Sequence, residues 1–150
     1  MTELVQWGAI AVAALNALPG ALGAWRWYRC ESSRGFWIAL RVAQVSALLY
    51  AIAVGALVVA GRSSSVQLFY LYALLPLAVA FVAEQLRVAS AQTILDQRDL
   101  DGAQAVGELP EREQHALVAE IVRREMGVMT LSALVVIFLA WRAAETAHGF

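Results

Sequence analysis

Apolar residues gather in four runs along the chain, and each run reaches or approaches the length of a membrane-spanning helix. The runs cover about residues 4–25, 36–60, 66–83 and 127–144. A helix rises about 1.5 Å per residue, so roughly 20 apolar residues cross a hydrocarbon core of about 30 Å. The runs lack the strict alternation of polar and apolar positions that half-buried strands show. The pattern therefore predicts an all-α integral membrane protein with four spans.

The distribution of arginine predicts which way these spans face. Nine of the eleven cations lie either around the connection between the first two runs or between the third and fourth runs. The first group is Arg26, Arg29, Arg34 and Arg41, and the second is Arg87, Arg98, Arg112, Arg123 and Arg124. Arginine accumulates on the cytoplasmic side of membrane proteins. We therefore expect both groups in the cytosol, and both termini on the outer side of the cell membrane.

The first run resembles a secretory signal peptide in position but not in its flanks. A signal peptide begins with positive charge, whereas the only charged residue before this run is Glu3. Residues 25–29, with the sequence WRWYR, follow the run directly and are typical of an anchor at the membrane interface. We expect the first run to be a true span.

The connection between the third and fourth runs differs from the two short ones. Residues 84–126 hold nine of the twelve carboxylates, and the segment from Glu84 to Leu95 contains no helix-breaking residue. Pro110 suits the start of a further helix that continues into the fourth run. Short connections elsewhere force neighbouring helices antiparallel. The prediction is an antiparallel up-down four-helix bundle, a single membrane domain over residues 1–150, with residues 84–126 as a cytoplasmic helical hairpin.

An apolar stripe marks the second helix of this hairpin. It consists of Leu117, Val118, Ile121 and Val122, which recur at helical spacing. If the stripe faces outward, it is a candidate docking face for a partner.

Small residues repeat every four positions in the first two spans. The rows are Ala9, Ala13, Ala17 and Ala21 in the first span, and Ala43, Ala47, Ala51 and Gly55 in the second. Such rows let two helix backbones approach closely in lipid. We expect these two spans to pack along the rows, although an alanine-rich chain produces such rows by chance as well.

Two groups of polar or helix-bending residues within the spans have both a functional and a structural interpretation. Asn16, Pro19 and Gly20 form a candidate hinge that either opens a cavity or merely curves the helix to fit the bundle. Arg41 lies inside the second span, at about the same depth in the membrane as Glu84, so we expect the two side chains to form an ion pair. Gln44, Gln85 and Arg87 extend this pair into a polar cluster, which either binds an anion or substrate or simply marks the membrane boundary.

The sequence offers no chemistry typical of an enzyme. His115 and His148 fall on opposite sides of the predicted membrane, which excludes a haem held by both, and no nucleotide-binding or hydrolase motif occurs. We expect no cofactor, no metal site and no catalytic residue.

Two hypotheses for function remain. The first is a non-enzymatic membrane protein that acts through contacts with lipids and with another membrane protein or its own copies, as an accessory subunit, assembly factor or regulator. The alternative is a small oligomeric transporter or channel whose polar path runs near Arg41, Glu84 and Asn16. The net charge of −1 argues against nucleic acid as a partner.

Composition supports a membrane location under either hypothesis. The chain of 150 residues is 61% hydrophobic and 15% charged, whereas soluble domains are about 45–50% apolar and about 25% charged. Cys30 is the single cysteine, so the chain cannot form an internal disulfide.

Overall fold

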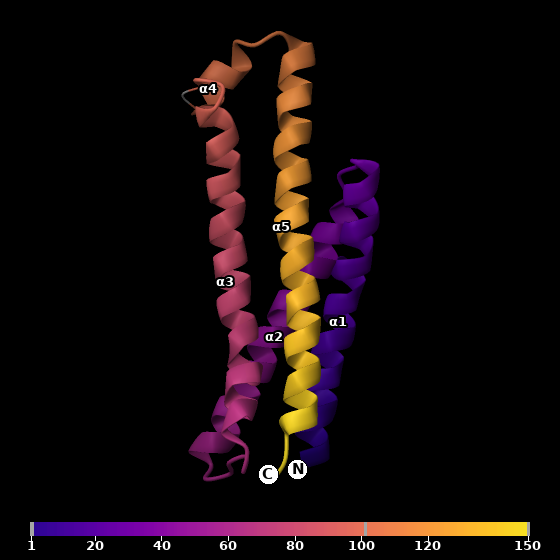
Figure 1. Ribbon diagram of the computed structural model, residues 1–150, viewed down its shortest axis with the longest axis vertical. Helices are drawn as coiled ribbons and strands as arrows, with labels where there is room; N and C mark the ends of the chain where they lie inside the picture. The colour runs from indigo at the N-terminus through magenta and orange to yellow at the C-terminus, as the bar shows by residue number, and fades with distance from the viewer. Residues whose placement is uncertain (1, 101, 150) are drawn as a thin grey trace.

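The computed structural model describes residues 2–100 and 102–149, and this part of the chain is helical throughout apart from short connections. Four of its helices are long and apolar enough to cross a membrane. The elements are α1 (Thr2–Arg29), α2 (Arg34–Val59), α3 (Gln67–Asp96), α4 (Gly102–Gly107) and α5 (Glu111–Thr146) (Figure 1). The all-helical prediction with four long apolar helices is confirmed.

The helices extend beyond the apolar runs that predicted them. α3 continues past Ala83 to Asp96, and α5 starts at Glu111 and passes unbroken through Gly127. Pro110 precedes the first helical residue, and its carbonyl accepts a hydrogen bond from the backbone N–H of Glu113 at 2.8 Å. The connection between α3 and α5 also contains the short helix α4.

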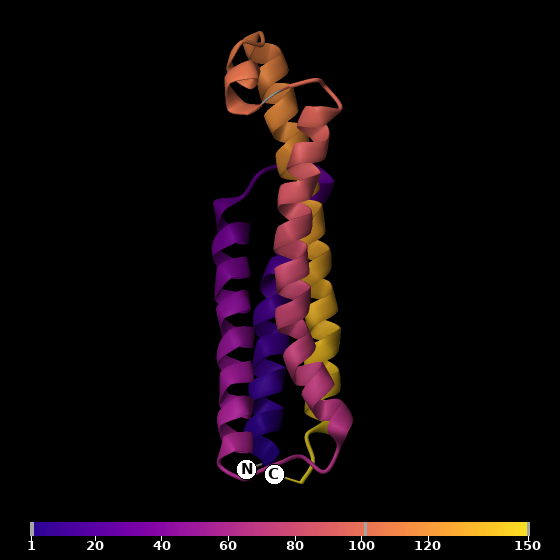
Figure 2. The ribbon, with the colours of Figure 1, turned by 90° about the vertical axis from the view of Figure 1, so that its left-hand side faces the viewer.

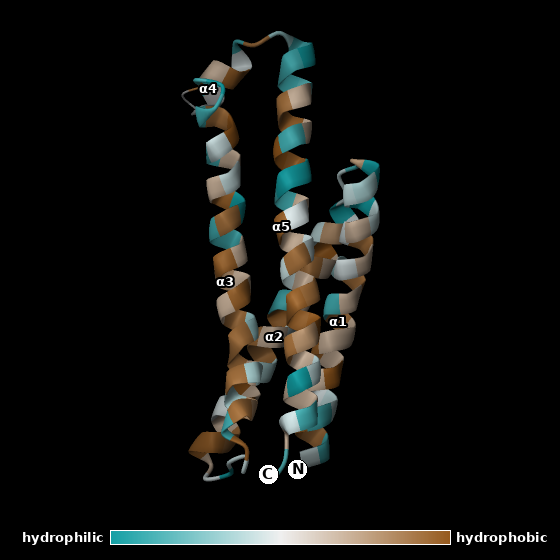
Figure 3. Cartoon of the chain, in the orientation of Figure 1, coloured by the Kyte–Doolittle hydropathy of each residue, from teal (hydrophilic) through white to brown (hydrophobic). Residues whose placement is uncertain are grey.

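The ends of the molecule differ in what they carry. Both termini and the α2–α3 connection lie at one end, which we call the terminal end (Figures 1 and 2). At the other end α3 and α5 run on past α1 and α2 before α4 and its loops join them. We call residues 84–126 the extension. Hydrophobic residues dominate the part below it, and hydrophilic residues are concentrated on the extension itself (Figure 3).

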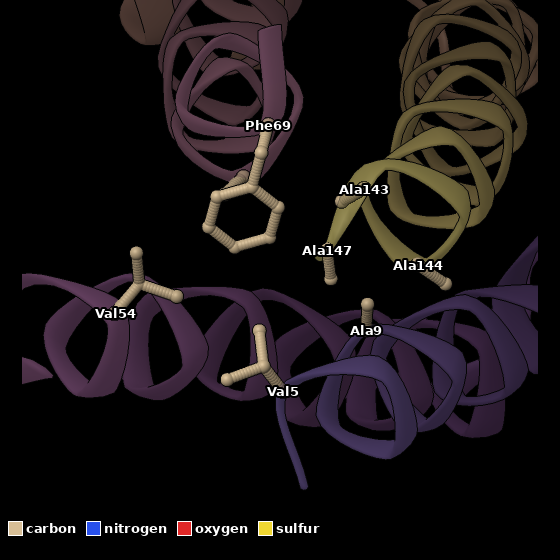
Figure 4. Close-up of a cluster of buried hydrophobic side chains, with 8 residues drawn as sticks. Val5, Ala9, Val54, Phe69, Ala143, Ala144 and Ala147 are labelled. Carbon is tan, nitrogen blue, oxygen red and sulfur yellow. The ribbon is translucent and has the colours of Figure 1, made fainter. Parts of the chain in front are cut away.

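α5 is the central helix of the packing, because α1 and α3 both lie against it, while α2 packs mainly on α1 and only sparsely on α3. Among the described residues, buried hydrophobic side chains form three clusters along the length of the bundle. The cluster at the terminal end gathers around the Phe69 ring, with Val5, Ala9, Val54, Ala73, Ala143, Ala144 and Ala147 (Figure 4). The middle cluster is Val12, Ala13, Ala47, Val136 and Ala140. The third, at the foot of the extension, is Phe36, Leu40, Ala83, Met126, Met129 and Ala133.

The two small-residue rows are buried only in part. Ala9, Ala13, Ala43, Ala47 and Ala51 are buried, whereas Ala17, Ala21 and Gly55 are exposed. Each four-residue step turns a helix about 40° beyond a full revolution, so a row at this spacing drifts off any straight contact. In α1 the buried face moves instead to Asn16, Gly20 and Gly23. The expectation that the whole rows pack together was therefore wrong for their ends.

Candidate functional site

The polar cluster predicted around Arg41 is centred on the carboxylate of Glu84. One guanidinium nitrogen of Arg41 lies 2.6 Å from Oε1 of Glu84 and 2.6 Å from Oε1 of Gln44. The Gln44 amide also donates to Oε1 of Glu84 at 3.2 Å. These contacts join the first half of α2 to the point where α3 enters the extension.

Arg87 completes the cluster from the other side of Glu84. Its Nε donates to Oε2 of Glu84 at 3.0 Å, and one of its terminal nitrogens lies 3.9 Å from Oε2 of Glu125 on α5. Its guanidinium carbon also lies 5.6 Å from the ring centre of Trp37 on α2, a distance that permits a cation–π contact. Arg87 thereby links three helices.

The charged members of this cluster pair with one another. Two arginines face two carboxylates, and the Glu84 carboxylate accepts hydrogen bonds from three side chains. The Arg41 side chain is 53% exposed, whereas those of Glu84 and Arg87 are 26% and 27% exposed. Gln85 is exposed and makes none of the contacts above. The arrangement is suited to holding α2 against α3, which otherwise pack only sparsely on each other.

The candidate hinge residues lie inside an unbroken helix. Asn16 is 3% exposed, and its side-chain amide donates to the carbonyl of Val12 in the same helix at 2.9 Å. Pro19 is fully buried within α1, which remains helical on both sides of it. Gly20 faces α5, where a β-carbon would lie 3.1 Å from the Leu134 side chain. This geometry fits a tight α1–α5 contact better than an open cavity.

The candidate docking stripe does not form one outward face. Leu117 is fully buried, while Ile121 and Val122 are half-buried, and Val122 packs on the cluster of Phe36 and Met126. Only Val118, which is 52% exposed, remains broadly accessible. The condition set for a docking face, that the stripe faces outward, is therefore met by Val118 and not by Leu117.

A groove of about 410 Å³ lies beside Val118, between the end of α1 and the first half of α5. One wall is formed by the end of α1 and the connection after it, with Arg26, Trp27 and Ser32. The other wall belongs to α5, with Val118, Val122 and Arg123. Sequence reasoning did not find this groove. The lining residues are far apart along the chain, and their only local signals are the aromatic–arginine segment 25–29 and the apolar stripe.

Two further pockets lie elsewhere in the bundle and share no lining residue with the groove. One of about 340 Å³ lies between α1 and α2 and is lined mostly by apolar side chains, including Tyr50 and Val54. The other, of about 260 Å³, lies near Trp141 at the terminal end. Asn16, Arg41 and Glu84, the residues of the predicted polar path, line none of the three pockets.

Within residues 2–100 and 102–149, histidine, cysteine and carboxylate side chains do not come together in groups of three or more that could hold a metal ion. Nδ1 of His115 lies 2.7 Å from the carbonyl of Glu111 in the same helix. His148 lies at the terminal end, where its carbonyl accepts hydrogen bonds from Ser64 and Ser65. The two histidines are thus at opposite ends of the molecule.

Comparison with protein-family models, with curated proteins and with solved structures finds no match to this chain.

Proposed function

We propose that the chain is a multi-pass protein of the cell membrane, an antiparallel four-helix bundle with both termini outside and the extension in the cytosol as a helical hairpin. Three observations support this proposal. The four long helices are apolar enough to span a membrane. The termini share one end with the α2–α3 connection. Nine of the eleven arginines belong to the other end or its approaches, which the preference of arginine for the cytosol explains.

We infer that the protein is non-enzymatic and acts through contacts made by this hairpin, as an accessory subunit, assembly factor or regulator of another membrane protein or of its own copies. The observation that carries this inference is the extension itself. α3 and α5 continue together beyond α1 and α2, so most of their surface there is free of the bundle. Its exposed residues include the apolar Val118 and the charged Glu120 and Arg124. A projecting pair of helices that exposes charges of both signs and an apolar side chain is suited to recognition by another protein.

Site-specific photo-crosslinking in intact cells tests this function. A photoreactive amino acid at Val118 or Glu113, both exposed on α5, is expected to give a discrete protein adduct, either with one partner or with a second copy. The same amino acid at Arg62, exposed in the α2–α3 connection, is the matched control and should not give that adduct. Adducts of the same identity from all three positions, or none from the extension, would overturn a docking role for the hairpin.

The two hypotheses, docking and transport, differ in whether water reaches Asn16. A path near Arg41, Glu84 and Asn16 requires water to reach position 16, which is buried and bonded within α1. In a Cys30→Ser background, Asn16→Cys should resist a membrane-impermeant thiol reagent from either side if the protein works through contacts. Rapid labelling, with Ala21→Cys as a lipid-facing control that stays unlabelled, would favour the transporter instead.

A further inference from the structure

The groove between α1 and α5 combines positive charge with an apolar wall. Arg26 and Arg123 line it, and Glu31 is the only carboxylate among its lining residues. Arg26 forms an ion pair with Glu31. Arg123 is exposed and has no ion pair within the described part of the chain, so its guanidinium remains available. The groove therefore carries one uncompensated positive charge.

The apolar side of the groove leads toward the bundle. Trp27 and Met126 line it together with Val122, and Met126 belongs to the buried cluster at the foot of the extension. Trp27 packs closely on α5, where a β-carbon at Gly127 would lie 3.2 Å from the indole ring. An indole at this position is typical of the headgroup layer, with its ring in hydrocarbon and its N–H near water. The groove is thus amphipathic, with its apolar part on the bundle side.

We propose that this groove binds the phosphate of an anionic phospholipid from the cytosolic leaflet. Arg123 and Arg26 engage the phosphate, Ser32 offers a hydroxyl, and the lipid glycerol and upper chain pack on Trp27, Val122 and Met126. Basic pockets between helices on the cytosolic side are recognised sites for anionic headgroups. Arginine suits this task because its planar guanidinium can donate two hydrogen bonds to one phosphate.

This inference rests on the proposed orientation, since only then does the groove open at the cytosolic leaflet. It adds a lipid partner to the hairpin and places that partner where α1 meets the extension. A lipid bound there would contact both the α1–α2 connection, through Ser32, and the exposed part of α5, through Arg123.

Native mass spectrometry of the purified full chain in detergent tests the site. Phosphatidylglycerol and phosphatidylcholine with identical acyl chains are titrated separately, because the two differ in net charge and not in apolar area. The wild-type protein should retain phosphatidylglycerol more strongly. Arg123→Gln should weaken that binding by about tenfold, the loss expected when one charge-assisted contact of about 1.4 kcal/mol is removed.

Arg124→Gln is the matched control, because Arg124 is the neighbouring exposed arginine and does not line the groove. It should leave phosphatidylglycerol binding unchanged, and both variants should keep the wild-type melting temperature. Equal retention of the two lipids, or equal losses in Arg123→Gln and Arg124→Gln, would overturn the site. Displacement of phosphatidylglycerol by millimolar inorganic phosphate would show that the groove selects a free anion and would overturn the lipid assignment.

The two proposals fail in different ways. Loss of lipid selectivity with hairpin adducts still present would reject the groove and leave the docking function standing. Selective lipid binding without any adduct from the hairpin would support the groove and reject the docking function.

Discussion

Gly23 of α1 and Thr130 of α5 touch so closely that no side chain fits between them. A β-carbon at position 23 would lie 2.1 Å from the Thr130 hydroxyl oxygen and 2.6 Å from the Phe36 ring. This contact brings α1 onto α5 near the foot of the extension, next to the groove. A small residue at a helix crossing allows such an approach, which is a main source of packing energy between helices in lipid.

Gly23→Ala should therefore destabilise the protein even though alanine favours a helix. The added methyl group must push α5 or the Phe36 ring aside, and overpacking of this kind costs about 1–3 kcal/mol. Gly55→Ala is the control, because nothing lies within 4 Å of a β-carbon there. Thermal unfolding in detergent should show a lower melting temperature for Gly23→Ala alone. An equal or higher melting temperature would mean that the close α1–α5 crossing is absent.

Thr130→Val should leave the melting temperature unchanged or raise it. The Thr130 hydroxyl is buried without a hydrogen-bond partner in the described structure, and an unpaired buried polar group costs about 1–3 kcal/mol. Valine removes the unpaired hydroxyl, and we expect this gain to equal or exceed the cost of placing a slightly larger methyl group against Gly23. Thr146→Val serves for comparison, because that hydroxyl donates to the Arg142 carbonyl at 2.7 Å and its loss should bring no gain. Calorimetry of both variants in the same detergent checks the difference, and clear destabilisation by Thr130→Val alone would contradict it.

Arg87→Gln should destabilise the bundle more than Arg41→Gln. Arg87 contacts Glu84, approaches Glu125 and lies over Trp37, whereas the more exposed Arg41 bonds to Glu84 and Gln44. We expect a loss of about 1 kcal/mol for Arg87→Gln and less for Arg41→Gln, because exposed ion pairs contribute little.

Melting temperatures at low and high salt measure this ranking, and Arg124→Gln controls for the loss of one positive charge. Salt should reduce the Arg87 effect only in part, because the Arg87 and Glu84 side chains are mostly buried and salt screens such pairs less than exposed ones. The reverse ranking would show that Arg41, and not Arg87, holds α2 against α3.

Ser64→Ala should loosen the terminal end. The Ser64 hydroxyl donates to the His148 carbonyl at 2.8 Å and accepts the Val66 N–H at 3.2 Å, so it ties the end of the chain to the α2–α3 connection. We expect a loss of about 1 kcal/mol. Hydrogen exchange of residues 143–149 should accelerate in this variant and remain slow in Ser63→Ala, where the serine is exposed. Identical exchange in the two variants would show that the hydrogen bond from Ser64 to the His148 carbonyl is not formed.

Reporter fusions test the orientation on which the proposals depend. Alkaline phosphatase, which is active only outside the cytosol, should be active when fused after residue 150 or within residues 62–64. It should be inactive when inserted at Gln104, between the two long helices of the extension. Green fluorescent protein at the same positions gives the complementary readout. Activity at Gln104 would invert the topology, and it would remove both the cytosolic hairpin and the cytosolic lipid from consideration.

The helices of this protein could be predicted from its sequence because the relevant energies are local. Transferring apolar residues into hydrocarbon contributes a free energy that adds up along a run, and this sum identified the four long helices. Likewise, the absence of a helix-breaking residue between Glu84 and Leu95 indicated that α3 continues well past its apolar run.

Contacts between helices depended on the tertiary structure. Sequence spacing suggested that Ala17 and Ala21 pack, but the buried face of α1 turns to Gly20 and Gly23, because the helix must meet α5 as well as α2. Arg41 and Glu84 lie in contact, as their similar depth suggested, yet the role of Arg87 over Trp37 had no local signal.

Sequence alone thus determined the helical class, the four apolar helices and the uneven distribution of charge, since each follows from the solvation of individual residues. Only the tertiary structure decided that Leu117 is buried, that Gly23 meets Thr130, and that Arg26 and Arg123 line one groove. These features arise from the packing of side chains that lie far apart in the chain, and packing depends on the shapes of both surfaces together.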